Sequence, residues 1–165
     1  MIDSNFQKGC VLIIGGSGGI GSLCAQEFAQ SNAKVAITYY KNEQAAIDIA
    51  NEINADVKIY KLDNSNAKSV EETFKEVIKD YGSINTLVNA AGFDIPQKFI
   101  SEIDIDLWQG VINSDINGFF NLIKSGLPYL RESKGSIVFI SSAGLFKYSP
   151  GDILSVAPKA TIEHV

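Results

Sequence analysis

The chain has 165 residues, 45% of them hydrophobic, so it can bury one sizeable core and is expected to form one domain. Its formal net charge is −5 and its Lys and Arg residues are scattered singly. This charge pattern argues against a nucleic-acid partner, because phosphate backbones are bound by basic surfaces.

The sequence shows neither a secretory signal pattern nor an apolar run of the ~18 residues that a membrane span needs, so we expect a cytoplasmic protein. Cys10 and Cys24 suit small buried positions, and we expect no disulfide framework and no metal site.

The first predicted unit is a strand, a glycine-rich turn, a helix and a second strand. An apolar run over residues 11–14 leads directly into Gly15, and Gly19-Ile20-Gly21 follows. Residues 22–33 have apolar side chains at helical spacing, and residues 34–39 form the next predicted strand. Glycines let backbone N–H groups approach a pyrophosphate at a helix N-terminus, where the helix dipole favours negative charge. The pattern predicts a dinucleotide site; the alternative is an ordinary flexible loop between strand and helix.

The rest of the chain alternates between helices and strands. We predict helices over residues 43–54, 66–81 and 104–130, the last interrupted near Ser114, and another that starts at Ser155. The intervening strands are predicted over residues 57–62, 84–88 and 136–141. Such alternation gives a parallel sheet through right-handed crossovers, with both faces covered. The predicted fold class is therefore α/β, a Rossmann-like doubly wound parallel sheet of five strands.

Several motifs together resemble the short-chain dehydrogenase/reductase family over essentially the whole chain. They are the glycine turn, Asp63 after the third strand, Asn89-Ala90-Ala91-Gly92 after the fourth, Ile140-Ser141-Ser142 at the end of the fifth, and Lys159 in the last helix. One departure in the glycine turn is Ile14, where the family usually has Thr. Each motif residue also has a structural alternative: Asp63 as a loop cap, Asn89 as a turn residue and Ser142 as a helix N-cap.

The resemblance implies an NAD(P)(H)-dependent oxidoreductase that acts on a small-molecule substrate and forms a homo-oligomer. In the family, the residue at Asp63 contacts the adenine, and the segment at Asn89 steadies the sheet and lines the cofactor. The implied cofactor-binding residues are Gly15, Ser17, Gly18, Gly19, Ile20, Gly21, Tyr39, Lys41, Asp63, Asn64, Asn89, Ala90, Gly92 and Lys159. The implied catalytic residues are Ser142, Ser155, Lys159 and Asp115.

Two of the catalytic positions differ from the family pattern. Ser155 stands where the family has Tyr before the lysine, and Asp115 stands in the Asn position of the family's N-L-x-G element. A phenol has a pKa of roughly 10, whereas an aliphatic hydroxyl is about as weak an acid as water. We therefore expect Ser155 to orient a water or a thioester carbonyl. This arrangement resembles that of the family's 2,4-dienoyl-CoA reductases, in which a Ser precedes the Lys at this spacing. Tyr148 is the nearby phenol that could assist; the alternative is a loop aromatic at the edge of the core.

The end of the second strand bears on the choice of cofactor. Tyr39 and Tyr40 stand where NAD-binding members have an acidic residue that bonds the ribose 2′-OH, and Lys41 follows. Without a carboxylate there to repel a 2′-phosphate, NADP(H) is favoured and NAD(H) remains possible. Two observations weaken this preference: Gly18 stands where many NADP-using relatives have a basic residue, and Lys41 has the alternative of a solvated charge.

Three functions remain open from the sequence. The first is an NADPH-dependent reductase of a carbonyl or of a conjugated enoyl thioester. The second is a catalytically inactive relative that binds dinucleotide as a sensor or partner-binding module, as Ser155 and Asp115 suggest. The third is a C-terminally incomplete domain, because the family sheet has two further strands. On that reading the apolar strand over residues 136–141 is covered by more of a longer protein or by another chain.

Overall fold

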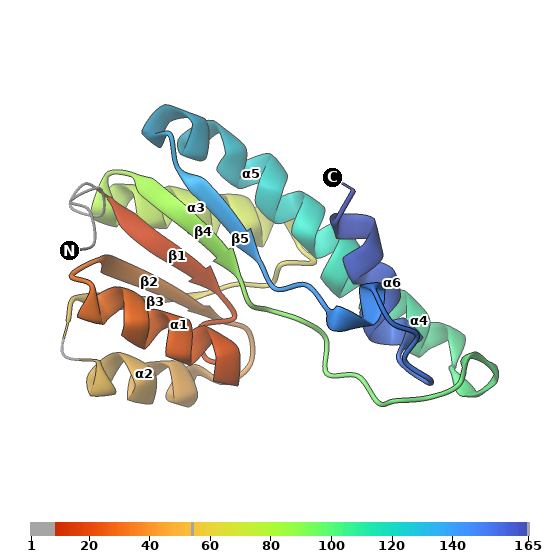
Figure 1. The fold of residues 1–165 in the computed structure, drawn as a ribbon. Coiled ribbons are helices and arrows are strands. Elements are labelled where there is room, and N and C mark those ends of the chain that lie inside the picture. The colour runs from red at the N-terminus through yellow and green to blue at the C-terminus, as the bar shows by residue number, and fades with distance from the viewer. Residues whose placement is uncertain (1–8, 54, 165) are drawn as a thin grey trace.

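The computed structural model describes residues 9–53 and 55–164. Its sheet has five parallel strands in the order β3-β2-β1-β4-β5, which confirms the predicted doubly wound arrangement (Figure 1). The strands are β1 (Cys10–Ile14), β2 (Lys34–Tyr39), β3 (Val57–Lys61), β4 (Ile84–Asn89) and β5 (Ser136–Phe139). The strand order reverses direction between β1 and β4, so the carboxyl ends of these two strands mark the switch point where ligands bind in open α/β sheets.

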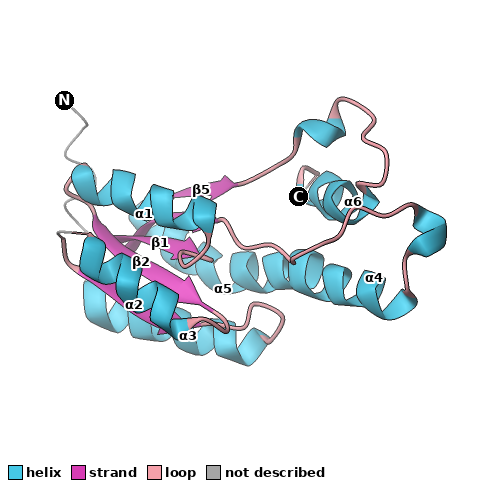
Figure 2. Cartoon of the chain, turned by 90° about the horizontal axis from the view of Figure 1, so that it is seen from below, coloured by secondary structure: helices cyan, strands magenta, loops and turns pink. Residues whose placement is uncertain are grey.

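Helices cover the two faces of the sheet. On one face lie α1 (Gly19–Gln30) and α2 (Glu43–Glu52), and on the other α3 (Ala67–Tyr81) and α5 (Gly118–Ser133) (Figures 1 and 2). The two remaining α-helices, α4 (Ile105–Val111) and α6 (Ile153–Ile162), lie beyond the carboxyl ends of the strands (Figure 1). The functional residues of the later motifs are thereby gathered at that end of the sheet.

The core follows the alternation of side chains along β1. Leu12 and Ile14 pack toward α3 and α5, while Val11 and Ile13 pack toward α1 and α2, and all four are buried. In the first cluster Phe74 of α3 is 1% exposed, and its ring stacks on Tyr129 with centroids 6.2 Å apart. Burying a side chain of this size stabilises the fold by about 1.5–3 kcal/mol.

The boundaries differ from the predicted ones mainly near the C-terminal end of the chain. β5 ends at Phe139 because Ser142 turns the chain into a 3-10 turn (Ala143–Leu145), and α6 begins at Ile153, earlier than predicted. α2 ends at Glu52, and position 54 of the predicted helix lies outside the described residues. We expected both faces of the sheet to be covered, but Ile137 and Val138 on β5 are 41% and 43% exposed.

The lengths of the helices and the surroundings of the two cysteines relate to two expectations from the sequence. None of the helices in the described ranges is long and apolar enough to cross a bilayer. Both cysteines are free thiols, Cys10 buried in β1 and Cys24 half-buried on α1. Burial raises the pKa of the Cys10 thiol to about 12, so Cys10 packs as a small apolar residue.

Candidate active site

The glycine turn joins the end of β1 to the start of α1. Gly15 has φ +75°, and its N–H donates to Thr38 Oγ1 of β2 at 3.0 Å. The N–H of Gly18 donates to the Gly15 carbonyl at 3.0 Å, which closes the turn. Gly18 is the N-cap of α1 and supplies no side-chain cap, and the first turn has no acidic residue. The N-terminal N–H groups of α1 therefore have no side-chain cap and can receive an anion.

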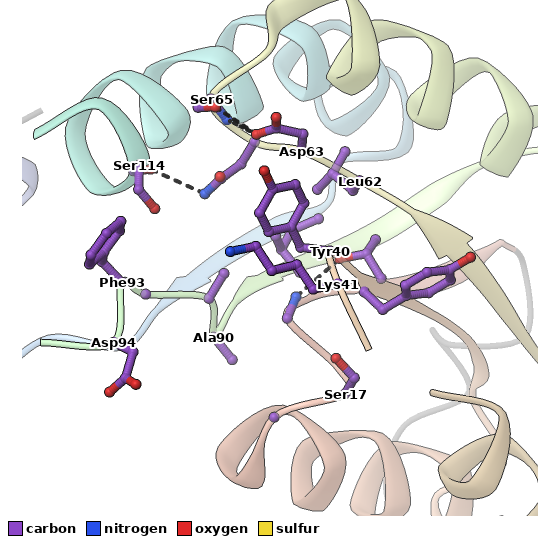
Figure 3. Close-up of a pocket in the computed structure, with 18 of the residues that line it drawn as sticks. Ser17, Tyr40, Lys41, Leu62, Asp63, Ser65, Ala90, Phe93, Asp94 and Ser114 are labelled. Atoms are coloured by element: carbon purple, nitrogen blue, oxygen red, sulfur yellow. Dashed lines mark hydrogen bonds between the residues drawn. The ribbon is translucent and has the colours of Figure 1, made fainter. Parts of the chain in front are cut away.

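A large cleft of about 750 Å³ lies at the carboxyl ends of β1 to β4 (Figure 3). It brings together predicted cofactor residues from four loops. These are Gly15, Ser17, Gly18, Tyr39, Lys41, Asp63, Asn64, Ala90 and Gly92. The volume is in the range of pockets that hold small molecules and cofactors, about 300–1,000 Å³.

The two tyrosines at the end of β2 have different environments. Tyr39 is 8% exposed and packs in the core cluster beneath α1 and α2. A hydrogen bond to the Glu43 carboxylate, together with burial, raises the pKa of Tyr39. Tyr40 is 53% exposed and projects into the large cleft, and the Lys41 ammonium lies 5.4 Å from the centroid of its ring (Figure 3). Tyr40, which was not among the predicted site residues, is thus the more accessible of the two.

A small cavity of about 250 Å³ adjoins the large cleft. Three of the four predicted catalytic residues line it, Asp115, Ser155 and Lys159, together with the cofactor candidates Ile20 and Asn89. The cleft and the cavity share Asn64, Ala90, Ala91, Gly92, Phe93 and Ser114. The space at the glycine turn and the space at Lys159 are therefore adjacent parts of one depression. Of the predicted cofactor-binding residues, Gly19 and Gly21 line neither the cleft nor the cavity.

Asp115 lies in a π-helical turn (Ile112–Asn117), where the predicted long helix is interrupted as expected. The N–H of Gly118 donates to the Asn113 carbonyl, the longer spacing that defines such a turn. The Phe93 N–H donates to Asp115 Oδ1 at 3.0 Å. Burial raises the pKa of Asp115, and hydrogen bonds from Ser114 and the Phe93 N–H, with the Lys159 charge, partly offset this effect.

The raised pKa of Asp115 predicts a pH-dependent change in stability. Ionisation of a carboxyl whose folded pKa exceeds its unfolded pKa lowers the free energy of unfolding, and this loss develops as pH rises through the folded pKa. Asp115→Asn should therefore be more stable than the parent at neutral pH, with the difference disappearing where Asp115 is protonated in both states. Urea unfolding at neutral pH and at a pH where Asp115 is protonated in both states measures this difference in stability. Asp56→Asn, which removes an exposed carboxylate, is the control. A difference in stability that does not depend on pH would contradict the prediction.

Three predicted site residues make local hydrogen bonds of the kind expected from their structural alternatives. Ser142 caps the 3-10 turn, its Oγ accepting the Gly144 N–H at 3.1 Å. Asp63 Oδ1 accepts the N–H of Ser65 at 3.0 Å, and Asn89 Oδ1 accepts the Ala91 N–H at 3.3 Å. Tyr148 is 83% exposed on the loop before α6, so it neither lines the cleft or cavity nor covers the edge of the core. A structural bond leaves the second carboxylate oxygen of Asp63 free to take another role, and Asp63 still faces the large cleft.

Some residues of the site had no clear signal in the sequence. Thr38 is 1% exposed and holds the Gly15 N–H, and its only sequence signal is a polar residue inside an apolar strand. Phe93 and Ser114 line both parts of the depression but belong to no motif. Their positions depend on contacts between the loop after β4 and the π-helical turn.

Comparison with known proteins gives one family. A family model described as short chain dehydrogenase matches residues 9–165. The 3-oxoacyl-[acyl-carrier-protein] reductase FabG of Staphylococcus aureus is 31% identical over 155 residues, which cover 92% of this chain and 63% of the relative. Sorbose reductase of Schizosaccharomyces pombe is 29% identical over 161 residues, covering 93% and 63%. The chain thus spans less than two thirds of the length of these relatives.

Solved structures share the fold at lower sequence identity. The 3-ketoacyl-(acyl-carrier-protein) reductase of Brucella melitensis complexed with NADH superposes with a TM-score of 0.87 at 22% identity, covering 94% of this chain and 66% of that one. The closed form of a serine dehydrogenase complexed with NADP+ gives a TM-score of 0.86 at 23% identity, covering 94% and 62%. At these identities the likeness shows the fold alone.

Proposed function

The chain belongs to the short chain dehydrogenase family, and from this premise we propose that it is a reductase that binds NADP(H). The observation that carries the proposal is that the cleft at the glycine turn adjoins the cavity at Lys159, with six lining residues in common. One end offers uncapped N–H groups of α1, and the other offers an ammonium, a hydroxyl and a carboxyl. Such a site suits a long, anionic ligand whose reactive end lies near the ionisable groups.

The donor set fits a dinucleotide. The N–H groups of Gly15 and Gly18 are bonded within the fold, so the N-terminal N–H groups of α1 would hold the pyrophosphate, and the lack of a side chain at Gly19 leaves open space in front of them. Asp63 and Asn64 would hold the adenosine, and Asn89, Ala90 and Lys159 would hold the nicotinamide end. When bound, the reduced nicotinamide supplies a hydride to the substrate.

The substrate class follows from the groups in the small cavity. Lys159 and Ser155 would orient a carbonyl oxygen by donating hydrogen bonds, and the ammonium favours the negative charge that develops there. Proton donation by Ser155 is disfavoured by its high intrinsic pKa. The Asp115 carboxyl, Lys159, or a water that these side chains hold would supply the proton. A carbonyl compound or a conjugated enoyl thioester, each with an oxygen to polarise, is the proposed small-molecule substrate.

The proposed preference for NADP(H) rests on the end of β2. No carboxylate stands there, and the nearest one on α2, Glu43, bonds to Tyr39. The Lys41 ammonium, over the face of Tyr40, lines the large cleft and would attract a 2′-phosphate.

Two substitutions should alter this preference in the same direction. Lys41→Ala should weaken NADPH binding about tenfold and leave NADH binding unchanged, since one surface charge contact to a phosphate is lost. Tyr40→Asp should reverse the preference by repelling a 2′-phosphate and accepting a 2′-OH. Fluorescence titration of NADPH and NADH measures both effects. Lys68→Ala, which removes an exposed lysine on α3, is the charge-matched control. Equal affinity of the parent for NADPH and NADH would contradict the proposed preference for NADP(H).

The reductase proposal is tested by nucleotide titration followed by turnover. The parent should bind reduced nicotinamide nucleotide and oxidise it when acetoacetyl or dienoyl thioesters are added. Binding without turnover of any of these substrates would favour the second candidate, an inactive dinucleotide-binding sensor or partner-binding module. That candidate is supported by Ser155 and Asp115, which stand at two catalytic positions of the family pattern. Absence of nucleotide binding would overturn both.

A further inference from the structure

Asn64 lies at the junction of the two parts of the depression. It follows Asp63 in the loop after β3 and lines both the large cleft and the small cavity. Its side chain does not point freely into solvent. The Asn64 Nδ2 donates to the Ser114 carbonyl of the π-helical turn at 3.1 Å, the bond drawn at Ser114 in Figure 3.

Two further contacts fix the same loop to the helices behind it. Asn121 Nδ2 of α5 donates to the Asn64 carbonyl at 3.0 Å. Gly118 gives room to the Asn64 side chain, because a Cβ at Gly118 would lie 2.8 Å from Asn64 Cγ. The loop that lines the large cleft is therefore joined on two sides to the segment that carries Asp115.

The Ser114 carbonyl that accepts the hydrogen bond from Asn64 belongs to the residue directly before Asp115. A π-helical turn is a rare geometry with a widened backbone, and a donor from outside the helix stabilises it. When that donor moves, the turn can relax toward α-helical spacing, which rotates the following residue. An α-helical arrangement of this turn would be the second state that coupling between sites requires.

We propose that Asn64 is a positioning residue that couples occupancy of the large cleft to the placement of the Asp115 carboxyl. A nucleotide in the cleft orders the loop after β3, the loop fixes the Ser114 carbonyl, and the π-helical turn presents Asp115 beside Lys159 of α6 and the Phe93 N–H. The inference rests on the proposed function, since it takes the ligand of the cleft to be a nucleotide. It assigns to Asn64 a role beyond ligand contact.

The test uses ADP, which has no nicotinamide group to reach Asp115. The side-chain carboxyl carbon of Asp115 is followed by NMR, its resonance assigned by its loss in Asp115→Asn. ADP should shift this resonance in the parent. In Asn64→Leu, which keeps a similar shape but loses the amide donor, ADP should still shift amides of the glycine turn while the Asp115 shift is lost. Any direct effect of the ADP charge would persist in this variant, and an altered contact between ADP and residue 64 is distinguished by the Asn121 variant, which leaves the Asn64 side chain in place.

Two other variants make the result decisive. Lys124→Ala alters an exposed residue of α5 that lines neither the cleft nor the cavity, and should keep the parent response. Asn121→Ala loosens the loop from α5 without changing the lining of the cleft, and should reduce the Asp115 shift. Asn121→Ala also tests the proposed coupling if Asn64→Leu does not fold. An unchanged Asp115 shift in Asn64→Leu or Asn121→Ala, or none in the parent, overturns the inference alone. Failure of ADP, NADPH and NADH to shift the glycine turn overturns the proposed function as well.

Discussion

Replacing Gly21 by alanine is expected to lower the free energy of unfolding by about 1–3 kcal/mol and to remove measurable nucleotide binding. A Cβ at this position would overlap the Gly15 carbonyl oxygen and lie 2.8 Å from Gly16 Cα. Those atoms are backbone, so they cannot move aside as a flexible side chain would. The turn and the first residues of α1 must separate, and the N–H groups proposed to hold the pyrophosphate separate with them. Urea unfolding and NADPH fluorescence measure the two effects.

Gly19→Ala is the matched control for this prediction. A Cβ at Gly19 would meet no heavy atom within 4 Å, so the variant should unfold at the parent's urea concentration. Its nucleotide affinity should still fall, because the methyl group would occupy the space in front of the helix N-terminus. If Gly19→Ala binds nucleotide as tightly as the parent, the pyrophosphate does not approach α1 closely. If Gly21→Ala is as stable as the parent, the close contact with Gly15 is not required.

Lys159→Ala is expected to lower turnover about a thousandfold or more, whereas Ser155→Ala lowers it only about tenfold to a hundredfold. Lys159 is the single cation among the described residues that line the small cavity, so its loss leaves the developing charge on the substrate oxygen unbalanced. Ser155 orients that oxygen, and water can replace its hydroxyl. Steady-state kinetics on whichever thioester the parent reduces would compare the two variants. Equal losses would instead give Ser155 a direct part in proton transfer.

Ser155→Tyr separates the reductase from the inactive relative. If the parent is inactive, the added phenol beside Lys159 should create carbonyl reductase activity. If the parent is active, the bulkier ring should displace the substrate from a small cavity of about 250 Å³ and turnover should fall. A parent and variant with the same activity would mean that neither side chain lies near the reacting atoms.

The sequence was sufficient to predict the sheet and its helices because the relevant signals are local. Val70, Phe74 and Val77 recur on one face of α3, and all three are buried as their spacing predicts. The interruption of the long helix near Ser114 was also predicted and is confirmed as a π-helical turn. Periodicity does not specify where a strand ends, so the predicted fifth strand extended beyond Phe139.

The details of the site were less accessible because they depend on contacts between distant residues. Asn64 is bonded to Ser114 and to Asn121, which are 50 and 57 positions away along the chain, and no spacing rule indicates such pairs. The alternation of side chains along β2 could have shown that Tyr39 and Tyr40 face different surroundings. Ser142 was predicted as a catalytic residue with a helix N-cap as its alternative, and only the course of the chain after β5 shows which N–H it caps, that of Gly144.

The two edges of the described sheet differ in how readily they accept another strand. The edge strand β3 has Lys58 and Lys61, charges of the kind that keep sheet edges from joining, whereas β5 has the apolar run Ile137-Val138-Phe139. Of the strands that the structure describes, β5 is therefore the edge that remains open to pairing with a further strand, whether that strand belongs to the same protein or to another chain, and β3 is the edge that resists such pairing.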